Sequence, residues 1–383
     1  MRNWLLPEYV EDILPLEALQ IEIMRRQIID LFLVHGYQQV IPPLLEYVES
    51  LLCGSGRDMD LKMFKVIDQL SGRMLALRAD MTPQAARIDA HLLNSEGITR
   101  LCYVNSVLHA VPSAITQTRE PLQIGAELYG HSGLESDLEI QRLMLKCLFV
   151  AGIREIHLDL GHVAVFRGII KGADISRELE AELFATLQAK DVSTLTELCK
   201  KLPKETREAL MLLPDLYGDK KILNYADSRL PDYLEIKQAL NELNIIAEEL
   251  ESTVNQISFD LADLRGYHYH TGIVFAAYSD GYSNAIVLGG RYDEIGKSFG
   301  RARPATGFSM DLRELTRLVN PKAYPRGIRA PFHTKNIELE AKIEELRGAG
   351  HIVIMELPQQ NNESLDCDRQ LILHNGQWIV EKI

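Results

Sequence analysis

Gln-Ile-Gly-Ala-Glu-Leu-Tyr-Gly, residues 123–130, alternates polar or small side chains with apolar ones. This alternation predicts a β-strand on which Gln123, Gly125 and Glu127 share one face. Taken alone, such a strand is more often half-exposed, with a polar face that meets only water. Whether this face binds a ligand therefore depends on the segments that the fold brings beside it.

The rest of the chain predicts helices packed around further strands. Apolar residues recur at three- and four-residue steps from about Leu16 to His35, and Gly36 follows where a left-handed helix cap would lie. Because the strands do not alternate regularly with helices, a Rossmann fold is a poor fit, and we predict an α+β fold, a mostly antiparallel sheet flanked by helices. The other predicted strands cover residues 37–46, 74–77, 101–104, 155–160, 257–261, 273–278 and 285–288.

Two changes of pattern divide the chain. From about residue 168 to residue 251 the periodicity becomes helical, which predicts a helical insertion in the first domain. Asn320-Pro321 and Pro325-Arg326-Gly327 then mark a boundary, which predicts a core domain of residues 1–320 and a small C-terminal α/β domain of residues 321–383. The elements predicted in the small domain are a helix over residues 337–347 and strands over 351–355, 370–373 and 378–380.

Composition is that of a soluble globular protein. The 383 residues are 46% hydrophobic and 25% charged, with a formal net charge of −13. This negative charge disfavours binding to nucleic acid or to anionic lipid, which takes clustered Lys and Arg. No signal-peptide pattern and no run of about 18 apolar residues is present, so we expect a cytoplasmic protein without a membrane span. Its five cysteines are odd in number and widely spaced, which favours neither disulfides nor a metal site.

Five segments occur in an order that resembles the histidyl-tRNA synthetases, which are class II aminoacyl-tRNA synthetases. They are Leu-Arg-Ala-Asp-Met-Thr-Pro at 77–83, the strand at 123–130, Arg-Gly-Tyr-His-Tyr-His-Thr-Gly at 265–272, Gly-Gly-Arg-Tyr-Asp at 289–293 and Pro-Ala-Thr-Gly-Phe-Ser-Met-Asp-Leu at 304–312. The helix that begins near Leu16 and the strand after it are similar to the family's motif 1, its dimer interface. The shared order is a stronger signal than any one match, and it implies the antiparallel class II sheet.

Histidine as a ligand offers an ammonium, a carboxylate and an imidazole ring, and a specific pocket needs a partner for each. The family has Tyr-Tyr where this chain has Tyr269-His270, and a neutral histidine there still donates or accepts a hydrogen bond. His268 and His270 would alternate on a strand, which is more often a surface or packed pair than a metal site, so we predict no metal. The resemblance implies that Asp80 and Thr82 bind the ammonium, Gln123 the main-chain end, Glu127, Tyr269 and His270 the ring, and Arg265 the carboxylate.

Two positions depart from what aminoacyl adenylation requires. By the same alignment, His109 stands where the family has its motif 2 arginine, and Glu314 where it has its motif 3 arginine, with Arg313 displaced by one position. One residue turns a helix by about 100°, so Arg313 should face elsewhere. Losing two guanidinium contacts costs on the order of 3 to 6 kcal/mol, or roughly two to four decades in rate. We therefore expect a protein that is not an enzyme and that uses no cofactor.

An amino-acid pocket without adenylation chemistry resembles the catalytically silent synthetase paralogues that serve as regulatory subunits of ATP phosphoribosyltransferase, the enzyme that opens histidine biosynthesis. The resemblance implies that free histidine binds for feedback inhibition and that the chain activates the short-form catalytic subunit, as a homodimer within a hetero-oligomer. Two alternatives stay open, a divergent active histidyl-tRNA synthetase and another class II-like ligase. Histidine-dependent exchange of pyrophosphate into ATP identifies the first alternative, and ATP binding by the purified protein the second.

Overall fold

The computed structural model describes most of the chain. The described residues are 4–53, 57–112, 118–173, 175–264, 269–319, 323–333, 335–359 and 366–383. Contacts within the chain divide it into two compact units, Met1–Asn320 and Pro321–Ile383. The larger unit contains the strand that was predicted at residues 123–130.

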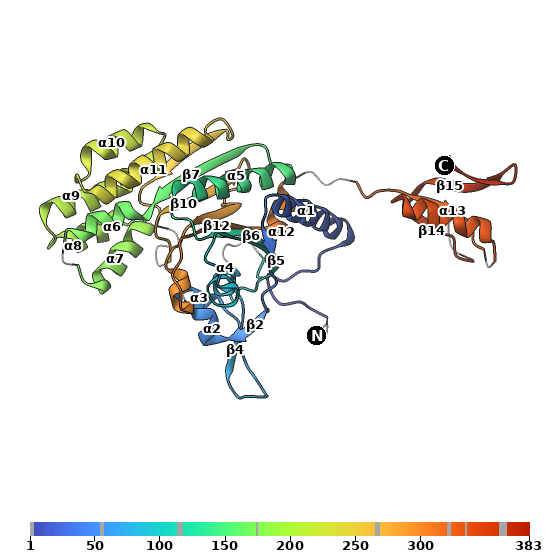
Figure 1. Ribbon diagram of the computed structural model, residues 1–383, viewed down its shortest axis with the longest axis horizontal. Helices are drawn as coiled ribbons and strands as arrows, with labels where there is room; N and C mark the ends of the chain where they lie inside the picture. The colour runs from blue at the N-terminus through green and yellow to red at the C-terminus, as the bar shows by residue number, and fades with distance from the viewer. Residues whose placement is uncertain are drawn as a thin grey trace. The chain divides into compact units, whose positions relative to one another are not determined.

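A nine-stranded sheet forms the centre of the larger unit (Figure 1), in the order β1-β5-β6-β12-β11-β10-β7-β9-β8. Its pairs are antiparallel except β1 with β5 and β7 with β9, which confirms the predicted mostly antiparallel sheet. The strands are β1 Gln38–Gln39, β5 Thr99–Ser106, β6 Leu122–Tyr129, β12 Ala305–Asp311, β11 Val287–Arg291, β10 Ile273–Ser279, β7 Ile156–His162, β9 Gln256–Asp260 and β8 Tyr217–Gly218.

Helices α1 (Pro15–Val34), α5 (Leu134–Ala151) and α12 (Leu312–Leu318) cover one face of this sheet (Figure 1). The apolar side chains of β6 belong to the same core as these helices, and the ring of Phe32 on α1 meets Phe308 on β12 at 6.1 Å. Helix α1 has proline in its first turn and is followed by Gly36 at φ +84°, the left-handed position that a residue without Cβ adopts at low cost. Truncating one such buried apolar side chain costs about 2 to 5 kcal/mol.

The polar residues of β6 lie on the opposite face, and small residues continue that row across the sheet. Glu127 pairs with Gly307, Gly307 with Gly290, Gly290 with Val274, and Val274 with Gly161. Directly paired residues of antiparallel strands point to the same side. Three glycines in one row leave room for other groups to lie against the sheet.

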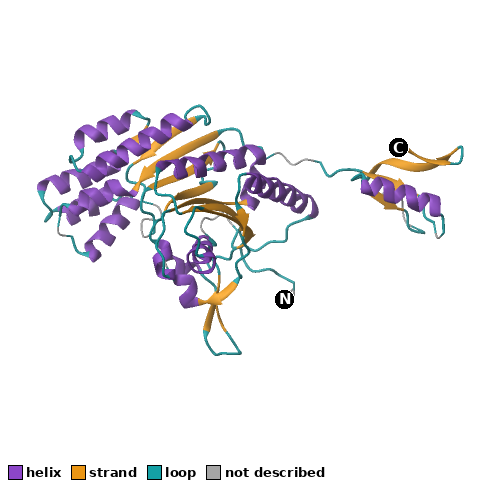
Figure 2. Ribbon diagram, in the orientation of Figure 1, coloured by secondary structure: helices purple, strands orange, loops and turns teal. Residues whose placement is uncertain are grey.

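A helical segment lies between β7 and β9 (Figure 2). It begins at Val163, earlier than the predicted residue 168, because the helix starts directly where β7 ends. Close packing joins its first and last helices, since a Cβ at Gly168 would lie 2.7 Å from Ile236. Its helices are α6 Val163–Lys171, α7 Arg177–Gln188, α8 Val192–Cys199, α9 Lys204–Leu212, α10 Lys221–Arg229 and α11 Leu234–Leu250.

The predicted strand at residues 37–46 is split in two. Pro42 and Pro43 interrupt it, and the part after them joins a separate three-stranded sheet, β2-β4-β3. Two of that sheet's strands, β2 and β3, together with β12 of the large sheet, were not predicted as separate strands. The elements around the small sheet are β2 Leu45–Tyr47, α2 Val48–Leu52, α3 Arg57–Lys62, β3 Lys65–Ile67, β4 Met74–Leu77, α4 Thr82–Arg87 and a π-helix, η1, at Ile88–Leu93.

The described residues of the smaller unit form a four-stranded sheet, β14-β13-β15-β16, and helix α13. Strand β13 was not predicted, because Pro325 and Gly327 read as a boundary, whereas β13 begins at Gly327 itself. Ile328, Leu339 and Ile343 belong to its core. The elements are β13 Gly327–Ala330, α13 Ile337–Gly348, β14 Val353–Met355, β15 Cys367–His374 and β16 Gln377–Lys382. Across the described parts of both units, no helix is long and apolar enough to cross a membrane.

Candidate functional site

Glu127 is the most deeply buried acidic group of the site. Its side chain projects from β6, the residue is 1% exposed, and its carboxyl accepts hydrogen bonds from the hydroxyls of Tyr103, at 2.7 Å, and of Tyr292. A Cβ at Gly307, on the neighbouring strand, would overlap Oε2 of Glu127. Burial raises the pKa of Glu127 to about 8, although both tyrosines lower it, so this carboxyl is mostly protonated at neutral pH.

Asp80, Thr82 and Gln123 form the second part of the site. The amide of Gln123 donates to Oδ1 of Asp80 at 2.8 Å, and its oxygen accepts from the backbone N–H of Met81 at 2.9 Å. Oδ1 of Asp80 also accepts the backbone N–H of Thr82 at 3.0 Å, where α4 begins. The hydroxyl of Thr82 lies 3.1 Å from that of Tyr103. Tyr103 therefore joins this cluster to Glu127.

Tyr269 and His270 complete the predicted ring contacts. Their ring centroids lie 4.1 Å apart, and Tyr269 meets Tyr292 edge-on at 6.2 Å. Burial, with the nearby charges of Asp80 and Glu127, raises the pKa of Tyr269. Tyr269 lies in a turn and His270 in no regular element, just before β10, so the alternation on a strand considered for His268 and His270 does not describe His270. His270 is 5% exposed, so it is not a surface residue.

Six of the seven predicted site residues thus lie on adjoining elements of one unit, connected directly or through two tyrosines. Arg265 lies outside the described residues, as does His268. The members that converge are Asp80, Thr82, Gln123, Glu127, Tyr269 and His270.

Sequence reasoning missed the two tyrosines that hold Glu127. Tyr103 pairs with Gly125, and a Cβ at Gly125 would lie 2.6 Å from the Tyr103 hydroxyl, so that glycine makes room for the ring. Tyr292 belongs to the segment Gly-Gly-Arg-Tyr-Asp at 289–293, one of the five segments that carry the family resemblance, for whose tyrosine no role was predicted. The period-two spacing of Gly290 and Tyr292 was the available signal, since it places both on the face of Glu127.

Arg291, the arginine of that same segment, serves the opposite face of the sheet. It forms a buried ion pair with Asp137 of α5 at 2.7 Å and donates to Ser136 at 2.8 Å. The charge of Asp137 raises the pKa of Arg291 although burial opposes it. This arginine therefore fixes α5 to β11, and the described hydrogen bonds of its side chain go to residues other than the predicted site residues.

The two positions that depart from the adenylation chemistry are engaged within the protein. Nε2 of His109 lies 3.0 Å from the carbonyl of Ala79, and burial lowers the pKa of that imidazole. Glu314 accepts from the hydroxyl of Tyr282 and from Arg317 at 3.1 Å. The carboxylate of Glu314 is thus hydrogen-bonded to two donors within the protein. Neither His109 nor Glu314 presents a fixed cation to a phosphate at neutral pH.

Arg313, one position before Glu314 on α12, has partners different from those of Glu314. It is 2% exposed and donates to the carbonyl of Glu120 at 3.1 Å and to the carboxylate of Glu11 at 3.0 Å. Its guanidinium therefore anchors the N-terminal segment to the segment before β6.

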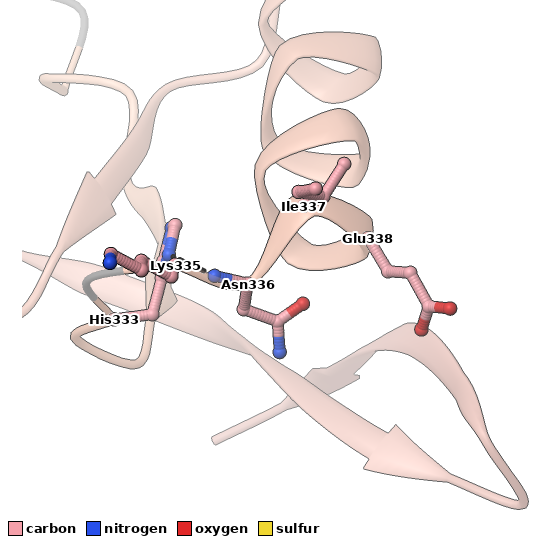
Figure 3. Close-up of a pocket in the computed structure, with 5 residues that line it drawn as sticks. All are labelled: His333, Lys335, Asn336, Ile337 and Glu338. Atoms are coloured by element: carbon pink, nitrogen blue, oxygen red, sulfur yellow. Dashed lines mark hydrogen bonds between the residues drawn. The ribbon is translucent and has the colours of Figure 1, made fainter.

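A separate hollow lies in the smaller unit at the start of α13 (Figure 3) and has a volume of about 520 Å³. Asn336 caps the helix by accepting the N–H of Leu339 at 3.0 Å, and its own N–H donates to Nδ1 of His333 at 3.2 Å. These bonds serve the helix terminus. Its lining consists of His333, Lys335, Asn336, Ile337 and Glu338. In the described part of the chain, no three His, Cys, Asp or Glu side chains are grouped to hold a metal ion.

Comparison with known families covers both units. Residues 9–315 match the family described as histidyl-tRNA synthetase. Residues 325–381 match the family described as the ATP phosphoribosyltransferase subunit HisZ C-terminal domain. The second match names the ATP phosphoribosyltransferase subunit and no synthetase, so it adds to the first match which of the two kinds of protein this chain is similar to.

Similar proteins agree over the whole length. The ATP phosphoribosyltransferase regulatory subunit of Nitrosomonas eutropha is 64% identical, over 99% of each chain, and that of Nitrosomonas europaea is 60% identical, over 100% of each. A Bacillus halodurans crystal structure described as an ATP phosphoribosyltransferase regulatory subunit/histidyl-tRNA synthetase superposes with a TM-score of 0.81 at 27% identity, over 94% of this chain and 95% of that one. The histidyl-tRNA synthetase of Nostoc shares the fold, with a TM-score of 0.77 at 18% identity, over 100% of this chain and 97% of its own. The chain therefore belongs to the family of ATP phosphoribosyltransferase regulatory subunits, which carry the class II synthetase fold.

Proposed function

We propose that this regulatory subunit binds free histidine between Asp80 and Glu127 and uses that binding for feedback inhibition of the short-form catalytic subunit, which it activates when histidine is absent. The observation that carries the proposal is the hydrogen-bonded connection from Gln123 and Asp80 through Thr82 and Tyr103 to Glu127. It joins a carboxylate suited to an ammonium with a buried carboxyl suited to an imidazole.

Histidine would bind by forming hydrogen bonds with Asp80 and Glu127, in part by replacing their present hydrogen-bond partners within the protein. Oδ1 of Asp80 already accepts from Thr82 and Gln123, which orients the carboxylate toward a cation. At Glu127 an imidazole would replace one of the two tyrosine hydroxyls as hydrogen-bond partner. The role of Arg265 at the ligand carboxylate stays a prediction.

Adenylation of the bound histidine is not part of the proposal. Charge development on an α-phosphate requires preorganised cations. His109 and Glu314 supply none at the positions that the resemblance assigns to them, and Arg313 is bonded to Glu11 and Glu120. We infer a regulatory protein of the cytoplasm that acts as a homodimer inside a hetero-oligomer with catalytic subunits.

An assay of phosphoribosyl transfer tests this function. The rate is measured with the catalytic subunit alone, after this chain is added, and after histidine is added to the two together. We expect little turnover alone, strong stimulation by the chain, and loss of that stimulation as histidine increases. A coupling free energy of about 1 to 3 kcal/mol between the histidine site and the catalytic subunit suffices. A rate that is indifferent to this chain, or stimulation that histidine leaves unchanged, would contradict the proposal.

Asp80→Asn is expected to weaken histidine binding by roughly ten- to a hundredfold, because a charge-assisted hydrogen bond contributes about 1.5 to 3 kcal/mol. Asparagine keeps an oxygen for the N–H groups of Thr82 and Gln123, so the local structure should persist. Titration calorimetry gives the dissociation constants. Asp68→Asn, in an exposed turn, is the matched control and should bind as the wild type does. Equal affinity of all three proteins would remove Asp80 from the site.

A further inference from the structure

Helix α6, the first helix of the helical segment, contacts the pocket directly. The guanidinium of Arg167 donates to the carbonyl of His270 at 2.8 Å. One turn earlier, the N–H of Val163 donates to the carbonyl of Gly272 at 3.1 Å. Residues 269–272, which we name the pocket segment, are therefore bonded to α6 at two carbonyls.

The other side of the pocket segment is bonded to the end of β11. The N–H of Thr271 donates to the carbonyl of Arg291 at 2.7 Å, and its hydroxyl accepts the N–H of Asp293 at 3.0 Å. A Cβ at Gly272 would lie 3.0 Å from the Arg291 side chain, so the approach is close. Arg291 is itself bonded to Asp137 of α5, so the pocket segment is anchored to the sheet where it meets β11. On its other side the pocket segment is bonded to α6, which belongs to the helical segment.

Helix α6 is in turn joined closely to α11. Gly168 and Ile236 leave no space for a methyl group between the two helices. His162 caps α6 by accepting the N–H of Ala164 at 3.1 Å, and its other ring nitrogen lies 3.1 Å from Glu242 on α11. The apolar face of α6 is buried along its length. A shift of α11 would therefore move α6 with it, because packed helices move as rigid bodies more easily than they deform.

We propose that Arg167 is a positioning residue for the histidine pocket, and that α6 couples the pocket segment to the surface of the helical segment. The inference rests on the proposed function and adds to it the route of regulation. Arg167 sets the carbonyl of His270, and with it the orientation of the neighbouring rings of Tyr269 and His270, which are tilted by 40° to each other. A partner that displaces α11 would change histidine affinity through this bond, and histidine would change the position of α11 reciprocally.

Amide hydrogen exchange of the ligand-free protein tests the positioning role without any ligand. In Arg167→Met the amides of Thr271 and Gly272 should exchange at least about tenfold faster than in the wild type, because one of the carbonyl anchors of the segment is lost. Arg167→Lys, which retains a donor of similar reach, should restore most of the protection. Arg347→Met is the matched control, since Arg347 also donates to a backbone carbonyl, that of Val353 at 3.1 Å, but belongs to the smaller unit. Unchanged exchange in Arg167→Met would overturn the inference.

Calorimetry with free histidine then tests the coupling. We expect Arg167→Met to bind histidine about tenfold more weakly than the wild type and Arg347→Met to bind it equally well. In the wild type, histidine should slow exchange in α6 and α11, and in Arg167→Met it should not. Equal slowing in both proteins would overturn the coupling. A wild type that binds no histidine would overturn the proposed function and the coupling together, while the exchange of the ligand-free proteins would still decide whether Arg167 positions the segment.

Discussion

Gly307→Ala is expected to abolish histidine binding and to lower the free energy of unfolding by about 3 to 5 kcal/mol. The added Cβ would overlap Oε2 of Glu127, lie 2.6 Å from its Cδ and 2.8 Å from the carbonyl of Ala126. Glu127 cannot yield cheaply, because it is fully buried and bonded to Tyr103 and Tyr292. Displacing it breaks the hydrogen bonds that connect Glu127 to the rest of the site.

Denaturant unfolding and titration calorimetry on the same preparation measure the two effects. Gly97→Ala is the control, since the nearest atom to its added Cβ is 4.0 Å away and its backbone requires no left-handed conformation. We expect that variant to match the wild type within about 0.5 kcal/mol. If Gly307→Ala instead kept the wild-type histidine affinity and unfolding midpoint, Glu127 would be free to move away from the added methyl group. The close contact between Gly307 and Glu127 would then not be required for the pocket.

Local patterns were sufficient for the elements that carry a clear period. Helix α1 was expected from about Leu16 to His35 and runs from Pro15 to Val34, and the strand expected at 155–160 is β7, Ile156–His162. Both depend only on which side chains face the core. Strand β12 was missed because its residues, Ala-Thr-Gly-Phe-Ser-Met-Asp, include small and polar types that resemble a loop. It is a strand because it pairs with β6 over residues 305–311 and with β11 over residues 306–310, which is a long-range property.

The candidate site shows the same division between local and long-range information. Gln123 and Glu127 could be assigned to one face of a strand from their spacing alone. That Tyr103 lies between Thr82 and Glu127 depends on the register of β5 against β6, in which Tyr103 meets Gly125. Likewise, a single-residue shift on a helix predicted that Arg313 turns away from Glu314. Its partner Glu11 is 302 residues distant in the sequence, and no periodicity indicates such a pairing.

The free energy of unfolding of Glu127→Gln is expected to depend less on pH than that of the wild type. The variant should be more stable than the wild type, by a margin that grows as pH rises. Burial raises the pKa of Glu127 from its ordinary value of 4.5 to about 8 in the folded protein. Below pH 4.5 both the folded and the unfolded wild type hold the proton, so this group does not oppose folding. Between pH 4.5 and 8 the unfolded chain releases the proton and the folded chain keeps it, so stability falls as pH rises. At about 1.4 kcal/mol per pKa unit, the loss is roughly 5 kcal/mol by pH 9.

Glutamine has the shape of the protonated carboxyl and carries no charge in either state, so it fits beside Gly307 and removes this source of pH dependence. Other titrating groups act in both proteins, and the difference in unfolding free energy between variant and wild type isolates position 127. Urea unfolding at intervals from pH 5 to pH 9 should show that difference growing steadily in favour of the variant. The exposed Glu96→Gln serves as the control and should track the wild type. A difference curve for Glu127→Gln that is flat over this range would mean that the carboxyl is already ionised in the folded protein. In that case Tyr103 and Tyr292 would be stabilising a buried carboxylate, and the pocket would present a fixed negative charge to the imidazole of histidine instead of a neutral partner.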